Sequence, residues 1–487
     1  MRLHIELVAR MGSIAVVLCF VGCVSPRDPY AGGSLPLPPP VFTERSAVES
    51  IGRSAEPKPD LVRTGASAPA GQQVYTPEEA IHFALQNNPM LLAVREQRGF
   101  AQGGVVIAKT YPYNPIASLR TSGVSGPEVS NWVAQSHSIT IDVELRGQRF
   151  FRKDAAFAAL TRTEWEIATQ EVAVAINTIR AFNTVVYRQR KLEVLEDTIK
   201  FSKGVVDQVK KLVDLNRLRP ADLIMAGTEY DADRAQLGQG SAALAVARAE
   251  LRRQLGTFDD SFTVRGELDL PLPTTDVAVY AEAAKEKRPD LQARKFAVTE
   301  AQAKLRLQVA DRYGNLFVGP SYEYNETRSN FIGLQFGGPI PVLNRRSGEI
   351  MQAQATFARA LADVQQLDIQ AGQDVQAALA RLAAARAWVE SYKAEVLPHL
   401  LQAVKDMNKL FELNDPGVDV IRLIGVQRNY LRAFDNYLDA LYELSQARAD
   451  LAAAVADPAL AVGLYAPSPN PPTPLPAPQP LPAPVPK

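Results

Sequence analysis

Two adjacent stretches decide the fold of this chain. Residues 138–145 read Ser-Ile-Thr-Ile-Asp-Val-Glu-Leu, with an apolar residue at every second position. Residues 150–216 follow almost directly and contain no proline and only one glycine, Gly204. Strict alternation predicts a strand with one apolar and one polar face. The second stretch predicts a nearly unbroken helix of about 67 residues, roughly 100 Å long.

The same order of elements occurs twice. Residues 80–113 align with residues 280–313 at a spacing of about 200 residues, and Pro89 matches Pro289. In the first copy we expect strands at 115–124 and 138–145 with a turn at 123–131; in the second copy, strands at 316–324 and 330–336. Four strands are too few to close a barrel alone. A soluble antiparallel sheet explains the alternation equally well.

Helices surround each strand pair. Thr76, Pro77 and Glu79 form a helix-start pattern, so a helix is expected from there to about residue 110, interrupted at Asn88-Pro89. The second copy predicts a helix over 276–312, interrupted at 288–289, and a long one over 345–414 with a kink or join near Leu397. Each long helix is followed by a short turn and a returning helix of about 40 residues, which predicts antiparallel coiled-coil hairpins.

The ends of the chain have different compositions. An apolar run over residues 11–22 stops at Cys23 and is too short to span a bilayer, so it predicts an export signal. Residues 20–23, Phe-Val-Gly-Cys, resemble the bacterial lipobox, which predicts acylation of Cys23; the alternative is an ordinary signal peptide cut nearby. Val24 after the cysteine favours the outer membrane. We expect a lipoprotein-type signal peptide at 1–22, a flexible tether at 23–73, the two copies of the repeated unit at 74–260 and 261–458, and a proline-rich disordered tail at 459–487.

Composition argues against several classes of function. The formal net charge is +0, which does not favour a nucleic-acid partner. After export the histidines would be His82, His137 and His399, too widely spaced for a zinc or copper site. Phosphate-binding loops, nucleophile elbows and zinc-protease motifs are missing from the sequence. We therefore expect neither an enzyme nor a bound cofactor or metal.

Charged residues gather at the turns between the long helices. The candidates for a gate or selectivity element are Asp222 at the first turn, and Asp415, Asp419 and Arg422 at the second. If several chains assemble around an axis, each residue becomes a ring of charge that can select ions. The alternative is helix capping, because Asp222 and Asp419 would lie at helix N-termini, where a carboxylate is favoured.

The motifs together resemble the TolC-type outer-membrane efflux channels, in detail the branch that serves heavy-metal (cobalt-zinc-cadmium type) pumps. The resemblance covers residues 76–456 in order. It rests on the motifs at 75–80, 88–89, 111–115, 288–290, 339–345 and 416–420, together with Cys23.

The resemblance implies a mainly α-helical protein with a membrane β-barrel. In that family a homotrimer closes a 12-stranded barrel in the outer membrane of a Gram-negative bacterium, and the helices form a periplasmic tube. The tube meets a periplasmic adaptor protein and an inner-membrane pump of the RND type, and the channel itself is a passive conduit. By position, Asp419 lies where the family narrows its entrance. Many members have a second acidic residue three positions later, where this chain has Arg422.

Two other functions are compatible with parts of this pattern. A conduit for type I protein secretion has the same fold and is not separable by sequence. A periplasmic coiled-coil adaptor or scaffold would have one helical hairpin, whereas this chain repeats the whole unit. The substrate class stays open among metal ions, drugs and other small molecules, because the first strand pair departs from the family pattern at residues 141–149.

Overall fold

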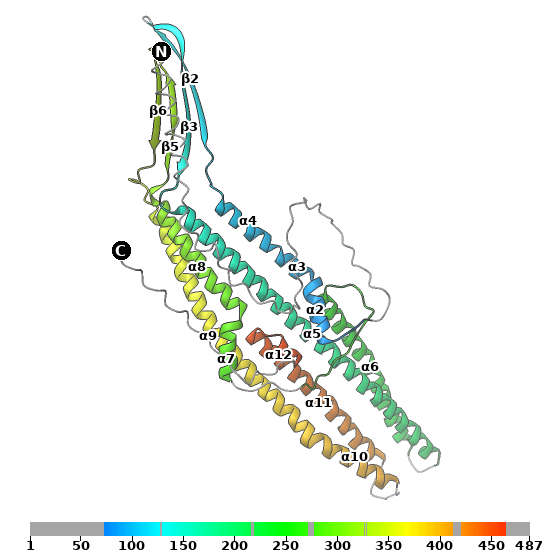
Figure 1. Ribbon diagram of the computed structural model, residues 1–487. Helices are drawn as coiled ribbons and strands as arrows, with labels where there is room; N and C mark the ends of the chain where they lie inside the picture. Colours follow the sequence, from blue (N-terminus) through cyan, green and yellow to red (C-terminus); the bar gives the residue numbers. More distant parts are fainter. Residues whose placement is uncertain are drawn as a thin grey trace. The chain divides into compact units, whose positions relative to one another are not determined.

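The computed structural model describes residues 73–126, 129–215, 219–270, 277–325, 327, 329–412 and 420–463 (Figure 1). Cys23, the expected signal peptide, residues 23–72 of the expected tether, Asp415, Asp419 and residues 464–487 of the expected tail lie outside these residues. The tail expected from residue 459 starts too early, because Ala459–Val462 is helical and buries Leu460 and Ala461. The helices are α2 (Pro77–Asn87), α3 (Pro89–Arg95), α4 (Gln97–Lys109), α5 (Gln148–Asp214), α6 (Pro220–Leu255), α7 (Val277–Lys287), α8 (Pro289–Ala310), α9 (Ser347–Ser391), α10 (Leu397–Glu412), α11 (Val420–Val455) and α12 (Ala459–Val462). The strands are β1 (Gln73–Tyr75), β2 (Ile116–Gly126), β3 (Val129–Val143), β4 (Phe262–Val264), β5 (Leu316–Tyr324) and β6 (Asn330–Gly337).

Local sequence explains where the first helices begin. The Thr76 hydroxyl accepts a hydrogen bond from the Glu79 amide, and the Glu79 carboxylate accepts one from the Thr76 amide, which confirms the predicted capping box. Asn88 ends α2 and caps α3, its side-chain oxygen accepting from the amides of Met90 and Leu91. The second copy is interrupted at the matching position, between α7 and α8.

The four long strands form one antiparallel sheet in the order β2-β3-β5-β6. Figure 1 shows them side by side. The predicted strands of the second copy agree with β5 and β6 to within one residue. The expected turn at 123–131 contains the reversal of the chain but is too long, because β2 continues to Gly126 and β3 begins at Val129. Glycine, serine and asparagine in that stretch indicated a turn, but cross-strand pairing keeps most of it extended. β3 also ends at Val143 rather than at residue 145.

A second, parallel sheet pairs β1 with β4. The sequence did not predict it, because strands of three residues are too short to show periodicity. The sheet joins the start of the first repeat to the segment that follows α6. Tyr75 packs its ring edge against Phe262, with 5.7 Å between ring centroids.

Two helical hairpins make up more than half of the residues that the structure describes. α5 is 67 residues long, as predicted, and packs against α6. In the second copy a π-helical turn, Tyr392–Val396, separates α9 from α10 and confirms the join expected near Leu397. Pro398 lies just after that turn and supplies no backbone donor, a common cause of such irregularities. None of the helices described here is long and apolar enough to cross a membrane.

The main core lies where the two copies meet. It gathers buried side chains from α2, α5, α6, α7, α9, α11 and α12, including Ile81, Phe182, Leu251, Tyr280 and Leu451. Many of the remaining core positions are alanines, which allow close approach between helices. This core fixes the two hairpins beside each other, because α11 packs against both α9 and α5.

Candidate functional site

The sheet has an apolar face that the chain does not bury. Cross-strand pairs place Ile141 beside Val318 and Val318 beside Phe336. Further along the same face, Pro320 pairs with Leu334. Leu334 is 75% exposed and Phe336 84% exposed. The alternation in the sequence therefore produces a two-sided sheet whose apolar side is left exposed by the chain.

The opposite face carries several serine side chains, together with Phe317 and Phe331 toward its two ends. Ser118 pairs with Ser138, and Ser138 with Ser321. One register step away, Arg120 and Glu323 both pair with Ser136. This face therefore combines hydroxyls with the guanidinium group of Arg120 and at least two carboxylates, because Asp142 lies on it as well.

Gly319 permits the close approach of β5 to β3. A Cβ atom at this position would lie 1.8 Å from the carbonyl oxygen of Ile139. Backbone pairing between β3 and β5 is interrupted at this level and resumes at Ile141 and Val318. The next residue, Pro320, has no amide hydrogen to donate to the ladder. A glycine is thus required at this position, because a larger residue would collide with the backbone of β3, which cannot move aside as a flexible side chain could.

The outer edges of the sheet are β2 and β6. Within the described part of the chain neither pairs with a further strand. Each edge leaves a row of backbone donors and acceptors available for another strand. The edges differ in length, since β2 has 11 residues and β6 has 8.

The predicted gate residues are only partly described. The Asp222 carboxylate accepts a hydrogen bond from the Arg219 amide at 3.1 Å and so caps the start of α6. Arg422 is an exposed residue in the first turn of α11. Because Asp415 and Asp419 lie outside the described residues, the expected grouping of these side chains stays a prediction.

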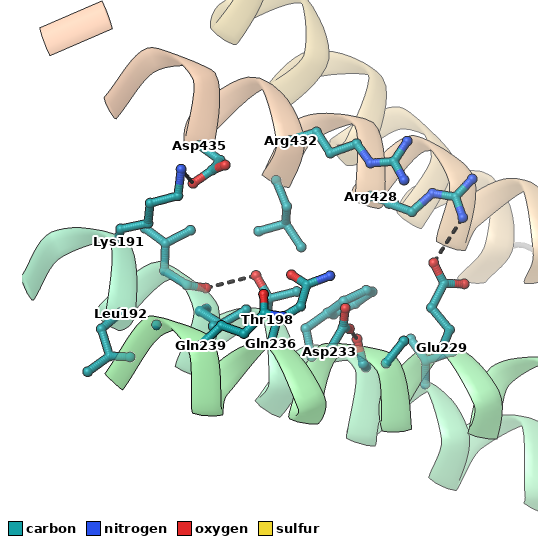
Figure 2. Close-up of a pocket in the computed structure, with 18 of the residues that line it drawn as sticks. Lys191, Leu192, Thr198, Glu229, Asp233, Gln236, Gln239, Arg428, Arg432 and Asp435 are labelled. Atoms are coloured by element: carbon teal, nitrogen blue, oxygen red, sulfur yellow. Dashed lines mark hydrogen bonds and ion pairs between the residues drawn. The ribbon is translucent and has the colours of Figure 1, made fainter. Parts of the chain in front are cut away.

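A groove of about 570 Å³ lies between the two hairpins, lined by α5, α6 and α11 (Figure 2). Apolar side chains of Leu192, Leu195, Val205 and Leu431 contribute to its lining. Charged residues from both hairpins surround them, including Asp233, whose carboxylate accepts a hydrogen bond from the Ser202 hydroxyl at 2.5 Å.

Ion pairs connect the hairpins on both sides of this groove. Arg428 of α11 contacts Glu229 of α6 at 2.9 Å. Lys191 of α5 contacts Asp435 at 3.1 Å and Asp439 at 3.0 Å on α11. Burial opposes the positive charge of Lys191, but the hydrogen bonds to Asp439 and Tyr187 and the charge of Asp435 outweigh it and raise its pKa above the ordinary value.

The sequence reasoning missed these connecting residues, although a signal for one pair was present. Glu229 and Arg428 are 199 residues apart, almost the repeat spacing, so the pair joins near-equivalent positions of the two copies. Aligning the returning helices and searching for opposite charges at matching positions would have found it. For Lys191 and its partners the spacing gives no comparable signal.

The described residues contain no group of histidine, cysteine and carboxylate side chains able to hold a metal ion. His82 lies on α2, His137 on β3 and His399 on α10. His137 lies on the apolar face of the sheet, where it pairs with Tyr322 and its ring packs 5.8 Å from that ring.

Comparisons with known proteins find similarity in structure but not in sequence. No protein-family model matches the chain, and no curated protein matches it. A membrane protein from Pseudomonas aeruginosa matches with a TM-score of 0.65 and 18% identity, covering 78% of this chain and 92% of the other. The outer-membrane channel OprN matches with a TM-score of 0.65 and 15% identity, covering 78% and 90%.

The Neisseria gonorrhoeae MtrE outer-membrane channel, solved in its open state, matches with a TM-score of 0.61 and 16% identity. That match covers 85% of this chain and 98% of MtrE, so it spans both copies of the repeated unit. The similarity of fold thus extends over nearly the whole length of these proteins. The chain has the fold of the outer-membrane channels.

Proposed function

We propose that this chain is an outer-membrane channel, the passive conduit of a tripartite efflux system. The observation that carries the proposal is the exposed apolar face of the sheet. Exposing apolar area to water costs roughly 25 cal/mol for each Å², so a soluble protein would cover this face. The hydrocarbon of a bilayer stabilises it instead.

The length of the strands supports the same conclusion. β5 has nine residues, about 30 Å along the strand at about 3.4 Å per residue. With the tilt of roughly 40° usual for membrane barrels, this corresponds to about 23 Å across the membrane, close to the apolar band of roughly 25 Å in outer-membrane barrels. The alternation predicted from the sequence is thus long enough for a membrane strand.

Three chains together would pair the unpaired backbone groups at the edges of the sheet. Open edges do not occur in hydrocarbon, because each unpaired backbone group there costs several kcal/mol. If β2 of one copy pairs with β6 of the next, a homotrimer closes a barrel of 12 strands. Two copies would give a barrel of eight strands, whose interior is nearly filled by side chains. The serine-rich face would then line the lumen.

The helical hairpins would form the periplasmic part of the conduit. An adaptor protein would meet this part, and an inner-membrane pump of the RND type would supply the energy. The groove between the hairpins has apolar walls and charged residues of both signs, as expected for a surface that receives an amphipathic helix. Metal ions, drugs and other small molecules are the candidate cargo.

The tips of the hairpins would narrow the entrance. In a trimer Asp222, Asp415, Asp419 and Arg422 become rings of charge around one axis, which can select among ions. Arg422 would offset the acidic rings, so we expect weaker cation preference than a purely acidic entrance gives.

Acylation of Cys23 would add a lipid anchor on the periplasmic side of the outer membrane. Metabolic labelling with a fatty acid tests this. Label is expected on the wild-type chain and not on Cys23→Ala. Label that remains on the variant would refute the assignment.

Conductance in planar bilayers tests the proposed function. The purified chain is expected to give discrete steps, and Asp419→Ala and Arg422→Ala are expected to change step size or ion preference. The variants matter because a closed entrance would hide the conductance of the wild type. Absence of steps in all three proteins would reject the channel, whereas steps unchanged by both variants would reject only the gate residues.

A further inference from the structure

The segments that join strands to helices carry an unusual combination of side chains. β3 passes into α5 through residues 144–147, and β6 passes into α9 through residues 338–346 (Figure 1). Both segments expose a leucine and an arginine within two residues of each other. We define the junction surface as Leu145, Arg146, Ile340, Leu343 and Arg345 of these segments together with Arg149 in the first turn of α5, all of which are exposed.

The two copies build this surface in the same way. In the first, Leu145 and Arg146 precede Gly147, which caps α5 in a left-handed conformation with φ of 73°. In the second, Leu343 and Arg345 precede Arg346, which caps α9 with φ of 53°. Positive φ is costly for a residue with a side chain. At Arg346 the turn is therefore held by its surroundings, and both long helices begin from a left-handed residue.

The apolar residues of the junction surface are exposed to an extent that is unfavourable in water. Leu343 is 99% exposed, Ile340 82% and Leu145 63%. Phe336, on the apolar face of the sheet, lies only four residues before Ile340. The junction surface thus continues the apolar face toward the helices.

The basic members have no carboxylate partner among the residues that the structure describes. Arg146 lies over the ring of Tyr313, 3.7 Å from its centroid, and Arg149 donates to the Lys109 carbonyl at 3.3 Å. The nearby carboxylates are engaged elsewhere, since Glu144 pairs with Arg152 at 2.7 Å and Asp311 with Arg346 at 3.5 Å. Three guanidinium groups are left for an external anion.

We propose that the junction surface binds anionic phospholipid at the membrane boundary, with its leucines and isoleucine among the acyl chains and its arginines on the phosphates. Two observations select this occupant: the continuity with the apolar face of the sheet, and guanidinium groups without carboxylates. An apolar side chain next to an arginine matches the boundary between acyl chains and headgroups. The inference rests on the proposed function, because that function places the helices on the periplasmic side.

Lipid-induced stabilisation of the purified full chain in detergent tests the proposal. A ligand that binds only the folded state raises the melting temperature as its concentration rises. The probes are phosphatidylglycerol, phosphatidylethanolamine and free glycerol phosphate. The variants are Arg146→Gln/Arg345→Gln, Leu343→Ser, and the control Arg294→Gln/Arg359→Gln, which removes the same charge from exposed positions on α8 and α9.

Phosphatidylglycerol is expected to raise the melting temperature of the wild type and of the control more than phosphatidylethanolamine does. In the arginine variant the concentration needed for half of the effect should rise about fivefold for each arginine at a headgroup. Leu343→Ser should weaken the effect of the lipid while leaving the mass of the assembly unchanged.

Three results would overturn the proposal. Equal lipid effects in the wild type and in the arginine variant would show that the guanidinium groups do not hold the headgroup. Equal stabilisation by glycerol phosphate would show a site for a free anion. Loss of assembly in Leu343→Ser would show that a second copy covers the surface. A chain that conducts but fails these tests loses only this inference, whereas a chain without conductance under any condition loses the proposed function.

Discussion

Substituting arginine on either face of one strand tests which side of the sheet meets lipid. Leu334 and Gln335 are neighbours in β6 and point to opposite faces. Leu334 pairs with Pro320, the middle residue of β5, so it would lie near the centre of the membrane. Gln335 pairs with Gly319 and would face the lumen.

The two faces predict very different free energies. Arginine on the lipid face near the midplane costs about 2–4 kcal/mol in outer-membrane barrels. At the lower limit of about 2 kcal/mol, the inserted fraction falls roughly thirtyfold relative to the uninserted one, since a factor of ten corresponds to about 1.4 kcal/mol. In a soluble sheet, by contrast, Leu334 would be an ordinary exposed site, where substitutions usually change stability by less than about 0.5 kcal/mol.

The assay is insertion into lipid vesicles, measured as the fraction of chain whose strands resist protease. The ratio of inserted to uninserted chain is expected to be at least about thirtyfold lower for Leu334→Arg than for the wild type. Gln335→Arg is expected to insert normally and to alter ion preference. Equal insertion of the two variants, or a stronger defect in Gln335→Arg, would refute the assignment of the faces.

Three other substitutions test the contacts that hold the sheet and the hairpins. Gly319→Ala places a Cβ atom 1.8 Å from the Ile139 carbonyl oxygen and should prevent assembly of the oligomer, measured on a native gel. In the control Gly333→Ala, the new Cβ meets only the Ser321 hydroxyl at 3.5 Å, so this variant should assemble normally. Assembly of both variants would contradict the close packing of β5 on β3. Glu229→Arg should loosen the contact between the hairpins and raise the conductance, with little change in melting temperature because an exposed ion pair contributes at most about 1 kcal/mol. Glu229→Arg/Arg428→Glu should restore the wild-type conductance. A double variant whose conductance is no closer to that of the wild type would show that this ion pair does not hold the hairpins together. Lys191→Met should lower the melting temperature by a similar amount at pH 7.5 and at pH 10.5. The raised pKa keeps Lys191 charged in the folded chain at its ordinary pKa of 10.5, and its contribution to stability is lost only as the pH rises through the folded-state pKa. A difference between variant and wild type that disappears by pH 10.5 would contradict this.

Much of the fold followed from the sequence because its signals are local and long. A 67-residue helix without proline, a capping box at Thr76 and strict alternation over 138–143 each point to one structure. The repeat then supplied the second copy. The prediction failed where local composition and tertiary pairing disagree, as in the long β2-β3 hairpin, and where an element is too short to show a period, as in the parallel pair β1 and β4.

The candidate site was less predictable than the fold. The sequence drew attention to Asp222, and the structure shows its carboxylate capping α6, a role that was one of the two alternatives. The groove and its ion pairs depend on how two hairpins far apart in sequence lie beside each other. Helical periodicity gives the faces of a single helix, but it does not give the register between helices.

The mass of the purified assembly in a mild detergent tests the central claim most directly, because it counts the chains that share one barrel. Each chain has four strands in its antiparallel sheet, and closing that sheet into a conduit requires several chains. We expect a single species of three chains that dissociates only on unfolding. A stable, folded monomer or dimer would contradict the account.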